Sequence, residues 1–131
     1  MIYGIGADPD ARKVSPLDIP HNANHYQYLA RRTQNTELCM EDKRKHAAFG
    51  LCAEAGEVAS LFQHYYQGAE ISKEKIIKEL GDCLWMIAEM CDTLGVSIME
   101  VMRQNIAKLG QRYPEGFSTE RSEGRHTWGE D

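Results

Sequence analysis

The chain has 131 residues, of which 42% are hydrophobic and 27% are charged, a composition typical of one folded globular domain. Its 20 acidic and 15 basic residues give a formal net charge of -5 at pH 7. Because nucleic acid and anionic membranes are captured by basic surfaces, this balance argues against both as partners. A phosphate-containing ligand would need a cation to bridge it to the protein.

The first 22 residues predict an extended N-terminal arm. They contain Pro9, Pro16 and Pro20 and show no apolar period. The opening residues lack the apolar run of a signal peptide, and no segment reaches the roughly 18 apolar residues of a membrane span. We therefore expect a cytoplasmic protein with an arm over residues 1–22.

Four helices are predicted after the arm, and their bounds follow from turn and cap residues. Gly68 interrupts the second helix and Gly95 ends the third, whereas Ser72 and Ser97 are suited to cap the third and the fourth. The expected helices are a short one from residue 24, then about 43–66, 72–94 and 97–109. The fold class is therefore all-α, a four-helix bundle over residues 23–117, followed by a polar tail over residues 118–131.

Two acidic pairs repeat the same offset on the second and third predicted helices. The stretch CAEAGEVASLF carries Glu54 and Glu57 one turn apart, and KELGD carries Glu79 and Asp82 in the same way. Both pairs lie just off one margin of an apolar sector that is expected to face the core. These sectors are Ala48, Leu51, Ala55, Val58 and Phe62 on the second helix, and Ile76, Leu80, Cys83, Leu84, Ile87 and Cys91 on the third.

The short connection at Gly68 predicts an antiparallel helix pair with the two apolar sectors facing each other. In such a pair the four carboxylates emerge along one edge, where they repel one another unless a cation lies between them. Oxygen ligands without His or Cys are the set that Mg²⁺ prefers, with Mn²⁺ as the alternative. The sequence therefore predicts a metal site along this edge.

The fourth predicted helix carries the opposite charge. Asn105, Lys108 and Arg112 share one stripe of NIAKLGQRYP. A cationic stripe beside an anionic pocket suits a metal-bound polyphosphate, because Lys and Arg bind phosphate oxygens. A single charged pair on a helix is most often solvated decoration, so the hypothesis depends on both acidic pairs and the basic stripe occurring together.

Recognition of a nucleobase has three candidate residues, His46, Gln27 and Trp85. A base needs a flat apolar wall and a hydrogen-bonding group at its edge, and these side chains supply such groups. Each also has a simpler interpretation. Trp85 points away from the predicted core sector, which favours a subunit interface, and His46 could orient a carboxylate or cap a turn.

The stretches HAAFGLCAEAGEV, KELGDCLWMIAE and NIAKLGQRYPEGFS resemble the MazG-type nucleoside triphosphate pyrophosphohydrolases of the all-α NTP pyrophosphatase superfamily. The resemblance covers about residues 25–125. It implies a four-helix MazG-like bundle that assembles as a homodimer or homotetramer. It also implies Mg²⁺-dependent hydrolysis of an NTP or dNTP to the monophosphate and pyrophosphate, a reaction that clears unwanted nucleotides.

The resemblance also implies roles for individual residues. The positions that match the metal ligands of the family are Glu54, Glu57, Glu79 and Asp82. The phosphate side is matched by Asn105 and Lys108, with Arg112 and Tyr113 completing that pocket. Either Glu54 or Glu57 would accept the proton of the attacking water.

Three alternatives remain open on the sequence. A phosphoribosyl-ATP pyrophosphohydrolase would share the fold and the carboxylates, and differs only in its substrate. A di-iron carboxylate bundle is disfavoured because its Glu-x-x-His pairs are absent. A non-enzymatic helical adaptor would tolerate replacement of all four carboxylates by alanine, whereas an enzyme would not.

Overall fold

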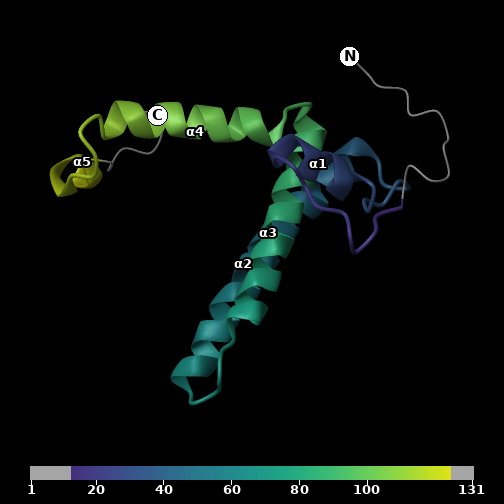
Figure 1. Cartoon of the computed structure of the whole chain (residues 1–131), viewed down its shortest axis with the longest axis horizontal. Coiled ribbons are helices and arrows are strands. Elements are labelled where there is room, and N and C mark those ends of the chain that lie inside the picture. Colours follow the sequence, from purple (N-terminus) through teal and green to yellow (C-terminus); the bar gives the residue numbers. More distant parts are fainter. Residues whose placement is uncertain (1–12, 125–131) are drawn as a thin grey trace. The chain divides into compact units, whose positions relative to one another are not determined.

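The computed structural model describes residues 13–124, which contain helices and no strand (Figure 1). The all-α prediction is confirmed for this part of the chain. The helices are α1 (Ala23–Arg31), α2 (Met40–Tyr66), α3 (Lys73–Leu94), α4 (Ile98–Arg112) and α5 (Thr119–Glu123). The chain divides between Ile98 and Met99 into two compact units, so α1, α2 and α3 belong to the first. Within residues 13–124 no helix is both long and apolar enough to cross a membrane.

Local capping explains why the ends of α3 lie where the sequence placed them. The Ser72 side chain accepts a hydrogen bond from the backbone N–H of Lys75 at 3.2 Å. At the other end Gly95 has φ +67, in the left-handed region that a residue without a Cβ adopts most easily. Asn22 caps α1 in the same way as Ser72, accepting from the N–H of His25 at 2.9 Å.

Three helix ends differ from the expected ones. The second helix begins at Met40 rather than near residue 43, because Glu41 and Asp42 favour the positive end of the helix dipole. The first begins at Ala23 rather than at residue 24, and the fourth continues to Arg112 rather than to about residue 109. Residues 119–123, within the predicted polar tail, form α5. Residues 125–131 of that tail, and residues 1–12 of the predicted arm, lie outside the described residues.

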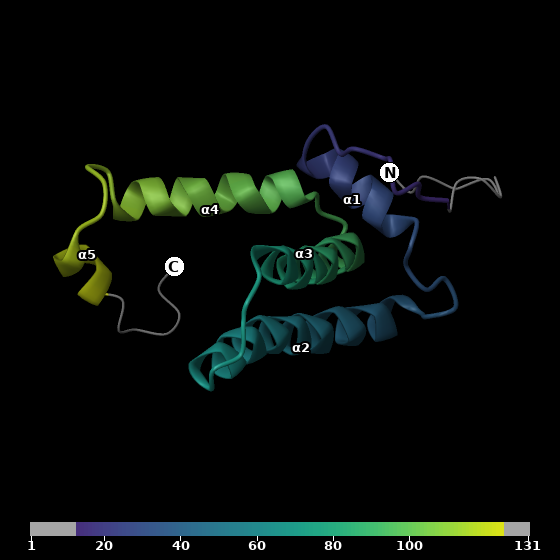
Figure 2. The same ribbon diagram turned by 60° about the horizontal axis from the view of Figure 1, so that its bottom comes forward.

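The long helices α2 and α3 lie side by side and antiparallel, as predicted (Figures 1 and 2). Gly68, with φ +96, lies in the short turn between them. The face of α2 that meets α3 includes Ala47, which is 1% exposed, and Gly50. A Cβ added to Gly50 would lie only 2.3 Å from the sulfur of Met86 on α3. Small residues therefore set the closest approach of the two helices.

The predicted core sector of α2 is wrong in its rotation, whereas that of α3 is right in part, because Cys91 is buried and Ile87 packs against the core. Leu51 and Phe62 of α2 are 36% and 44% exposed, and Leu80 and Leu84 of α3 are 50% and 48% exposed. The α2–α3 seam is instead centred on Ala47, Gly50 and the residues in line with them. Apolar and small residues surround most of the circumference of α2, so the sequence defines the centre of its apolar face poorly.

The first helix, α1, packs against the half of α3 that is distant from the turn. The buried core there consists of Ala30, Ala88, Cys91 and Ile98. Trp85 packs against this cluster, so the expectation that it points away from the core is wrong. Its indole N–H donates to the Thr33 hydroxyl at 2.7 Å, which satisfies the polar atom of the ring.

Gln27 of α1 is a structural residue. It is 4% exposed, and its amide donates to Asp92 at 2.8 Å and to the Val96 carbonyl at 3.0 Å. Its oxygen accepts from the backbone N–H of Ile98 at 2.7 Å. Because these bonds occupy a buried amide, they support the simpler, structural interpretation of Gln27 over its candidacy as a nucleobase contact.

Candidate functional site

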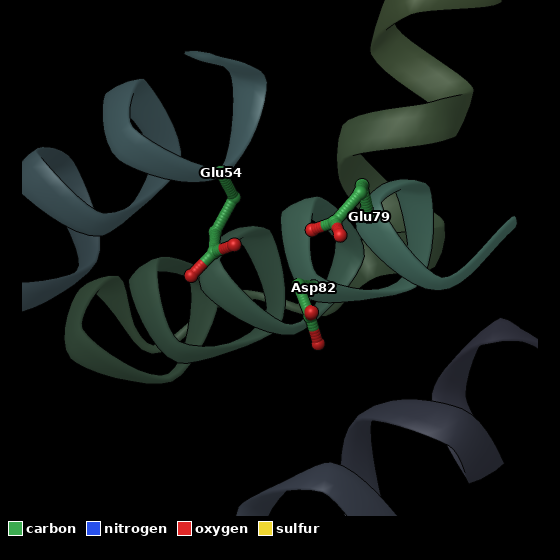
Figure 3. A group of neighbouring side chains, drawn as sticks. All are labelled: Glu54, Glu79 and Asp82. Carbon is green, nitrogen blue, oxygen red and sulfur yellow. The ribbon is translucent and has the colours of Figure 1, made fainter. Parts of the chain in front are cut away.

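Three carboxylates meet in the α2–α3 pair (Figure 3). Glu54 comes from α2, whereas Glu79 and Asp82 come from α3, one helical turn apart. One oxygen of each lies within 4.8 Å of the oxygens of the other two. Glu54 and Glu79 are partly buried and Asp82 is exposed. The antiparallel pairing of two helices with i, i+3 acidic spacing brings these groups together.

No described cation neutralises this carboxylate group. Within residues 13–124, none of the three forms a salt bridge or a side-chain hydrogen bond with a Lys, Arg or His. Three negative charges this close repel one another, the more so where they are partly buried. Carboxylate oxygens are the donors that Mg²⁺ and Mn²⁺ prefer, so the residues present fit a divalent cation.

The position of the group corrects the geometry expected from the sequence. Glu54 follows Ala47 and Gly50 along the α2–α3 seam, so the carboxylates lie in the seam and not beside an apolar sector. Glu57, the fourth predicted ligand, is exposed and lies outside the group. Its predicted role as a metal ligand gains no support from this geometry.

Tyr26 of α1 is a neighbour of this group that sequence reasoning missed. Burial, and after it the negative charge of Asp82, raises the pKa of the Tyr26 hydroxyl. The phenol is therefore protonated at neutral pH and lies within electrostatic reach of the Asp82 carboxylate. Because no helical period connects residues on different elements, the sequence held no signal for this electrostatic interaction.

His46 is bound to a carboxylate outside this group. Its Nδ1 lies 2.5 Å from Oε1 of Glu89, which is 1% exposed. The imidazole also meets the Trp85 ring edge to face, with centroids 6.0 Å apart. The interpretation that His46 orients a carboxylate agrees with this contact, and its role in substrate binding stays a prediction.

In the second compact unit, Asn105 and Lys108 line one groove on α4 together with Arg103 and Gln111. Arg103 is committed to Glu100, with hydrogen bonds of 2.8 and 2.7 Å. The hydrogen bonds from Arg103 and Gln104 lower the pKa of Glu100 to about 2. Within residues 13–124 Lys108 has no acidic partner. The groove therefore offers an ammonium group and amides to an anion.

Arg112 and Tyr113 lie at the end of α4 and do not line this groove. The Arg112 carbonyl accepts a hydrogen bond from the Arg121 guanidinium at 3.4 Å. The Tyr113 ring packs against Phe117 with centroids 5.8 Å apart. These contacts join the end of α4 to α5 and to the segment before it, and the proposed role of both residues toward phosphate stays a prediction.

The part of the chain that the structure describes is helical and brings three carboxylates together, and comparison with known sequences identifies its family. The profile of the MazG nucleotide pyrophosphohydrolase domain matches residues 44–117, more than half of the chain, and the chain belongs to this family. Its similarity to the Gene 37 protein of Mycobacterium phage L5 is 28% identity over 76 residues, covering 54% of this chain and 67% of the phage protein. No solved structure matches the chain significantly.

The family assignment confirms the resemblance stated from the sequence. The matched segment contains the three clustered carboxylates, Glu57 and the α4 groove. Proteins with a MazG domain generally use divalent metals, and the family indicates nucleotide pyrophosphohydrolase activity.

Proposed function

We propose that the protein hydrolyses nucleoside triphosphates, of the ribo or the deoxyribo series, to the monophosphate and pyrophosphate with Mg²⁺ as cofactor. The observation that carries the proposal is the group formed by Glu54, Glu79 and Asp82, three close carboxylates without a described cationic partner. Their place in the segment that matches the family supports a catalytic and not a structural role for this charge.

Glu54, Glu79 and Asp82 would hold the cation, with Mn²⁺ as an alternative to Mg²⁺. A bound divalent ion supplies positive charge that offsets the charge of the phosphates and of the leaving pyrophosphate. Asn105 and Lys108 are the proposed phosphate-binding residues, because they line a groove with an uncommitted ammonium group.

Of the two glutamates of α2, Glu57 is the proposed acceptor of the proton from the attacking water. Glu54 is committed to the carboxylate group, whereas Glu57 is exposed, one turn further along the helix and outside that group. A carboxylate that shares no cation retains the basicity that proton transfer requires. The sequence left open whether Glu54 or Glu57 accepts this proton, and the proposal selects Glu57.

The proposed assembly is a homodimer or homotetramer. Large apolar side chains of α2 support it, since Phe49 is 75% exposed and Phe62 is 44% exposed. Apolar surface of this kind is usually covered by another subunit or a partner. Clearance of unwanted nucleotides is the proposed role in the cell.

The decisive experiment is a product analysis with the purified chain and Mg²⁺. The eight common NTPs and dNTPs, and dUTP, are incubated separately, and pyrophosphate is resolved from orthophosphate. We expect pyrophosphate and monophosphate from a subset of these substrates. Glu79→Gln should reduce the rate by at least about 100-fold, because it removes one charge of the group. Glu74→Gln, an exposed change on the same helix, is the matched control and should leave the rate unchanged.

Three outcomes would overturn parts of the proposal. Release of orthophosphate would reject the reaction. Turnover of phosphoribosyl-ATP with none of the plain nucleotides would replace the substrate class. Absence of both turnover and metal binding, with a partner retained after all four carboxylates are changed to alanine, would identify a helical adaptor.

A further inference from the structure

Residues 13–21, called the N-terminal segment below, run back along α1. The Lys13 carbonyl accepts a hydrogen bond from the Arg32 guanidinium at 2.9 Å, directly after the last residue of α1. At the start of the helix, the backbone N–H of His21 donates to Nδ1 of His25 at 3.1 Å. The N-terminal segment is therefore joined to α1 by a hydrogen bond near each end of the helix.

The hydrogen bond at His25 defines the protonation state of its imidazole. A backbone N–H is always a donor, so Nδ1 accepts the bond without a proton and the neutral ring carries its hydrogen on Nε2. Binding of a proton at Nδ1 turns this acceptor into a donor and breaks the bond to His21. Histidine side chains typically gain a proton between pH 5 and 8. The bond therefore exists only while His25 is neutral.

A charged His25 ring would stand among unfavourable neighbours on its own element. The first turn of α1 has no acidic residue, and the positive end of the helix dipole opposes a cation there. The His21 ring stacks on the His25 ring with centroids 4.8 Å apart, so two charged rings would repel each other. Tyr28, with its ring centroid 6.4 Å from that of His25, already lies against the Arg32 guanidinium.

The acidic groups that face α1 from other elements act on residues other than the two histidines. On α3, Asp92 accepts a hydrogen bond from Arg31 at 2.7 Å, and the charge of Asp82 acts on Tyr26. In the N-terminal segment, Asp18 accepts a backbone hydrogen bond from within the segment at 2.8 Å. Among residues 13–124 no carboxylate pairs with either imidazole, so protonation of the ring favours release of the segment.

The rest of the attachment is weak enough for one hydrogen bond to matter. Leu17 and Ile19 are 87% and 74% exposed, so these side chains add little apolar burial to the segment. At the far end, Nε of Arg32 is buried without a hydrogen-bond partner among the described residues, which disfavours the attached state. The segment also forms one wall of an apolar pocket beside Trp85, and its release would uncover that wall.

We propose that His25 and the backbone N–H of His21 form an acid-sensitive switch, which attaches the N-terminal segment to α1 at neutral pH and releases it on acidification. The switch opens when Nδ1 of His25 binds a proton and closes when that proton leaves. Opening exposes the surface of α1 and α3 that the segment covers, including Trp85. The switch does not depend on the proposed activity, and it is tested without nucleotide.

NMR spectroscopy of the isotope-labelled full chain measures both parts of the switch. Near neutral pH, the ring nitrogen shifts of His25 should show a hydrogen on Nε2 and none on Nδ1. The backbone order parameters of residues 14–20, prolines excepted, should be about 0.85 near neutral pH and below about 0.6 near pH 5. Order parameters in α3 should stay at about 0.85 at both values, which shows that the change is local.

Three variants separate the hydrogen bond from the charge. Glutamine at the third residue of a helix commonly accepts a hydrogen bond from a backbone N–H at the helix start, and it does not titrate. His25→Gln should therefore keep residues 14–20 ordered at both pH values, whereas His25→Ala should leave them mobile at both. His21→Ala keeps the backbone donor and should retain the response to pH.

Several results would overturn the proposal. A hydrogen on Nδ1 of His25 near neutral pH would exclude the hydrogen bond. Loss of order near pH 5 in His25→Gln would assign the response to another group, such as Asp18, and unchanged order in His25→Ala would show that the bond does not hold the segment. If His25→Ala disturbs α1 as a whole, the unmodified chain decides. Its loss of order in residues 14–20 must share a midpoint with the His25 ring shifts, and a different midpoint rejects the switch.

Discussion

The α2–α3 seam carries acidic side chains at two places that differ in their surroundings. At one place Glu89 is 1% exposed and lies 2.5 Å from His46. About two helical turns away along α2, Glu54 joins Glu79 and Asp82 in a group without a described cationic partner. The α2–α3 pair therefore holds one buried acid with a hydrogen-bonded partner in the protein, and one acidic group without such a partner among the described residues.

This difference separates an acid that holds the fold together from acids kept for a ligand. A buried carboxylate is stabilised by its hydrogen-bonded partner, and removal of the partner leaves an uncompensated buried charge. Close carboxylates without a partner oppose folding until a cation binds. Substitutions at the two places should therefore change stability in opposite directions.

The largest effect is expected when the glutamates of α2 are changed one at a time. Glu54→Gln should lower Mg²⁺ affinity and the hydrolysis rate by at least about 100-fold, because it removes one carboxylate of the group. Glu57→Gln should reduce the rate to a similar extent while leaving Mg²⁺ affinity within about threefold, since Glu57 lies outside the group. Titration calorimetry with Mg²⁺ and pyrophosphate release measure the two quantities.

The stability of the same variants provides the control. In EDTA, Glu54→Gln should raise the free energy of unfolding by up to about 1 kcal/mol, because it relieves repulsion among the three carboxylates. A lower unfolding midpoint in EDTA would show that the group stabilises the metal-free fold, which contradicts the comparison.

The next effect concerns the satisfied acid. His46→Ala removes the partner of buried Glu89 and should lower the free energy of unfolding by about 2 kcal/mol, measured by urea denaturation. Lys45→Ala, beside it on α2, breaks only an exposed pair with Glu41 and should cost less than about 0.5 kcal/mol. Mg²⁺ affinity should stay within about twofold in both variants. A loss of Mg²⁺ binding in His46→Ala alone would show that the His46–Glu89 pair and the carboxylate group form one site.

A third test concerns Gly50, which lies on α2 between His46 and Glu54. Gly50→Ala puts a Cβ 2.3 Å from the Met86 sulfur, and we expect a net loss of about 1 kcal/mol because the flexible methionine yields only in part. Gly56→Ala meets no atom within 4 Å, and its better helix propensity should raise stability by about 0.5–1 kcal/mol. Thermal unfolding compares the two. Equal stabilisation by both changes would reject the close approach at Gly50.

The elements of the fold could be predicted because they depend on local chemistry. Ser72 and Gly95 bound α3 through cap interactions within a few residues, and such signals are legible in a sequence. The i, i+3 spacing of Glu79 and Asp82 placed both on one face of their helix. Three of the four predicted carboxylates meet in the structure for this reason.

The rotation of the helices could not be predicted, because it is decided by packing between elements. The sequence shows that α2 is apolar and small over much of its surface, but only the fit of Gly50 against Met86 selects the face that meets α3. One signal was present and unused: Glu89 stands alone in the apolar run WMIAEMC, and a buried acid there requires a partner such as His46.

The smallest effect is expected at Glu100, an acid of α4 that has a partner but lies at the surface. Hydrogen bonds from Arg103 and Gln104 lower its pKa from 4.5 to about 2, so any stabilisation is present above pH 4.5 and disappears as the pH falls through about 2. An NMR titration of the Glu100 carboxyl should show this low midpoint, and Glu100→Gln should leave the unfolding midpoint at pH 7 nearly unchanged. Because the same change releases Arg103 in the groove that Lys108 lines, it should raise affinity for inorganic pyrophosphate by less than about threefold. A marked fall in the unfolding midpoint would show that an exposed acid with hydrogen-bonded partners also stabilises the fold. That result would contradict the distinction drawn between buried Glu89 and the other acids.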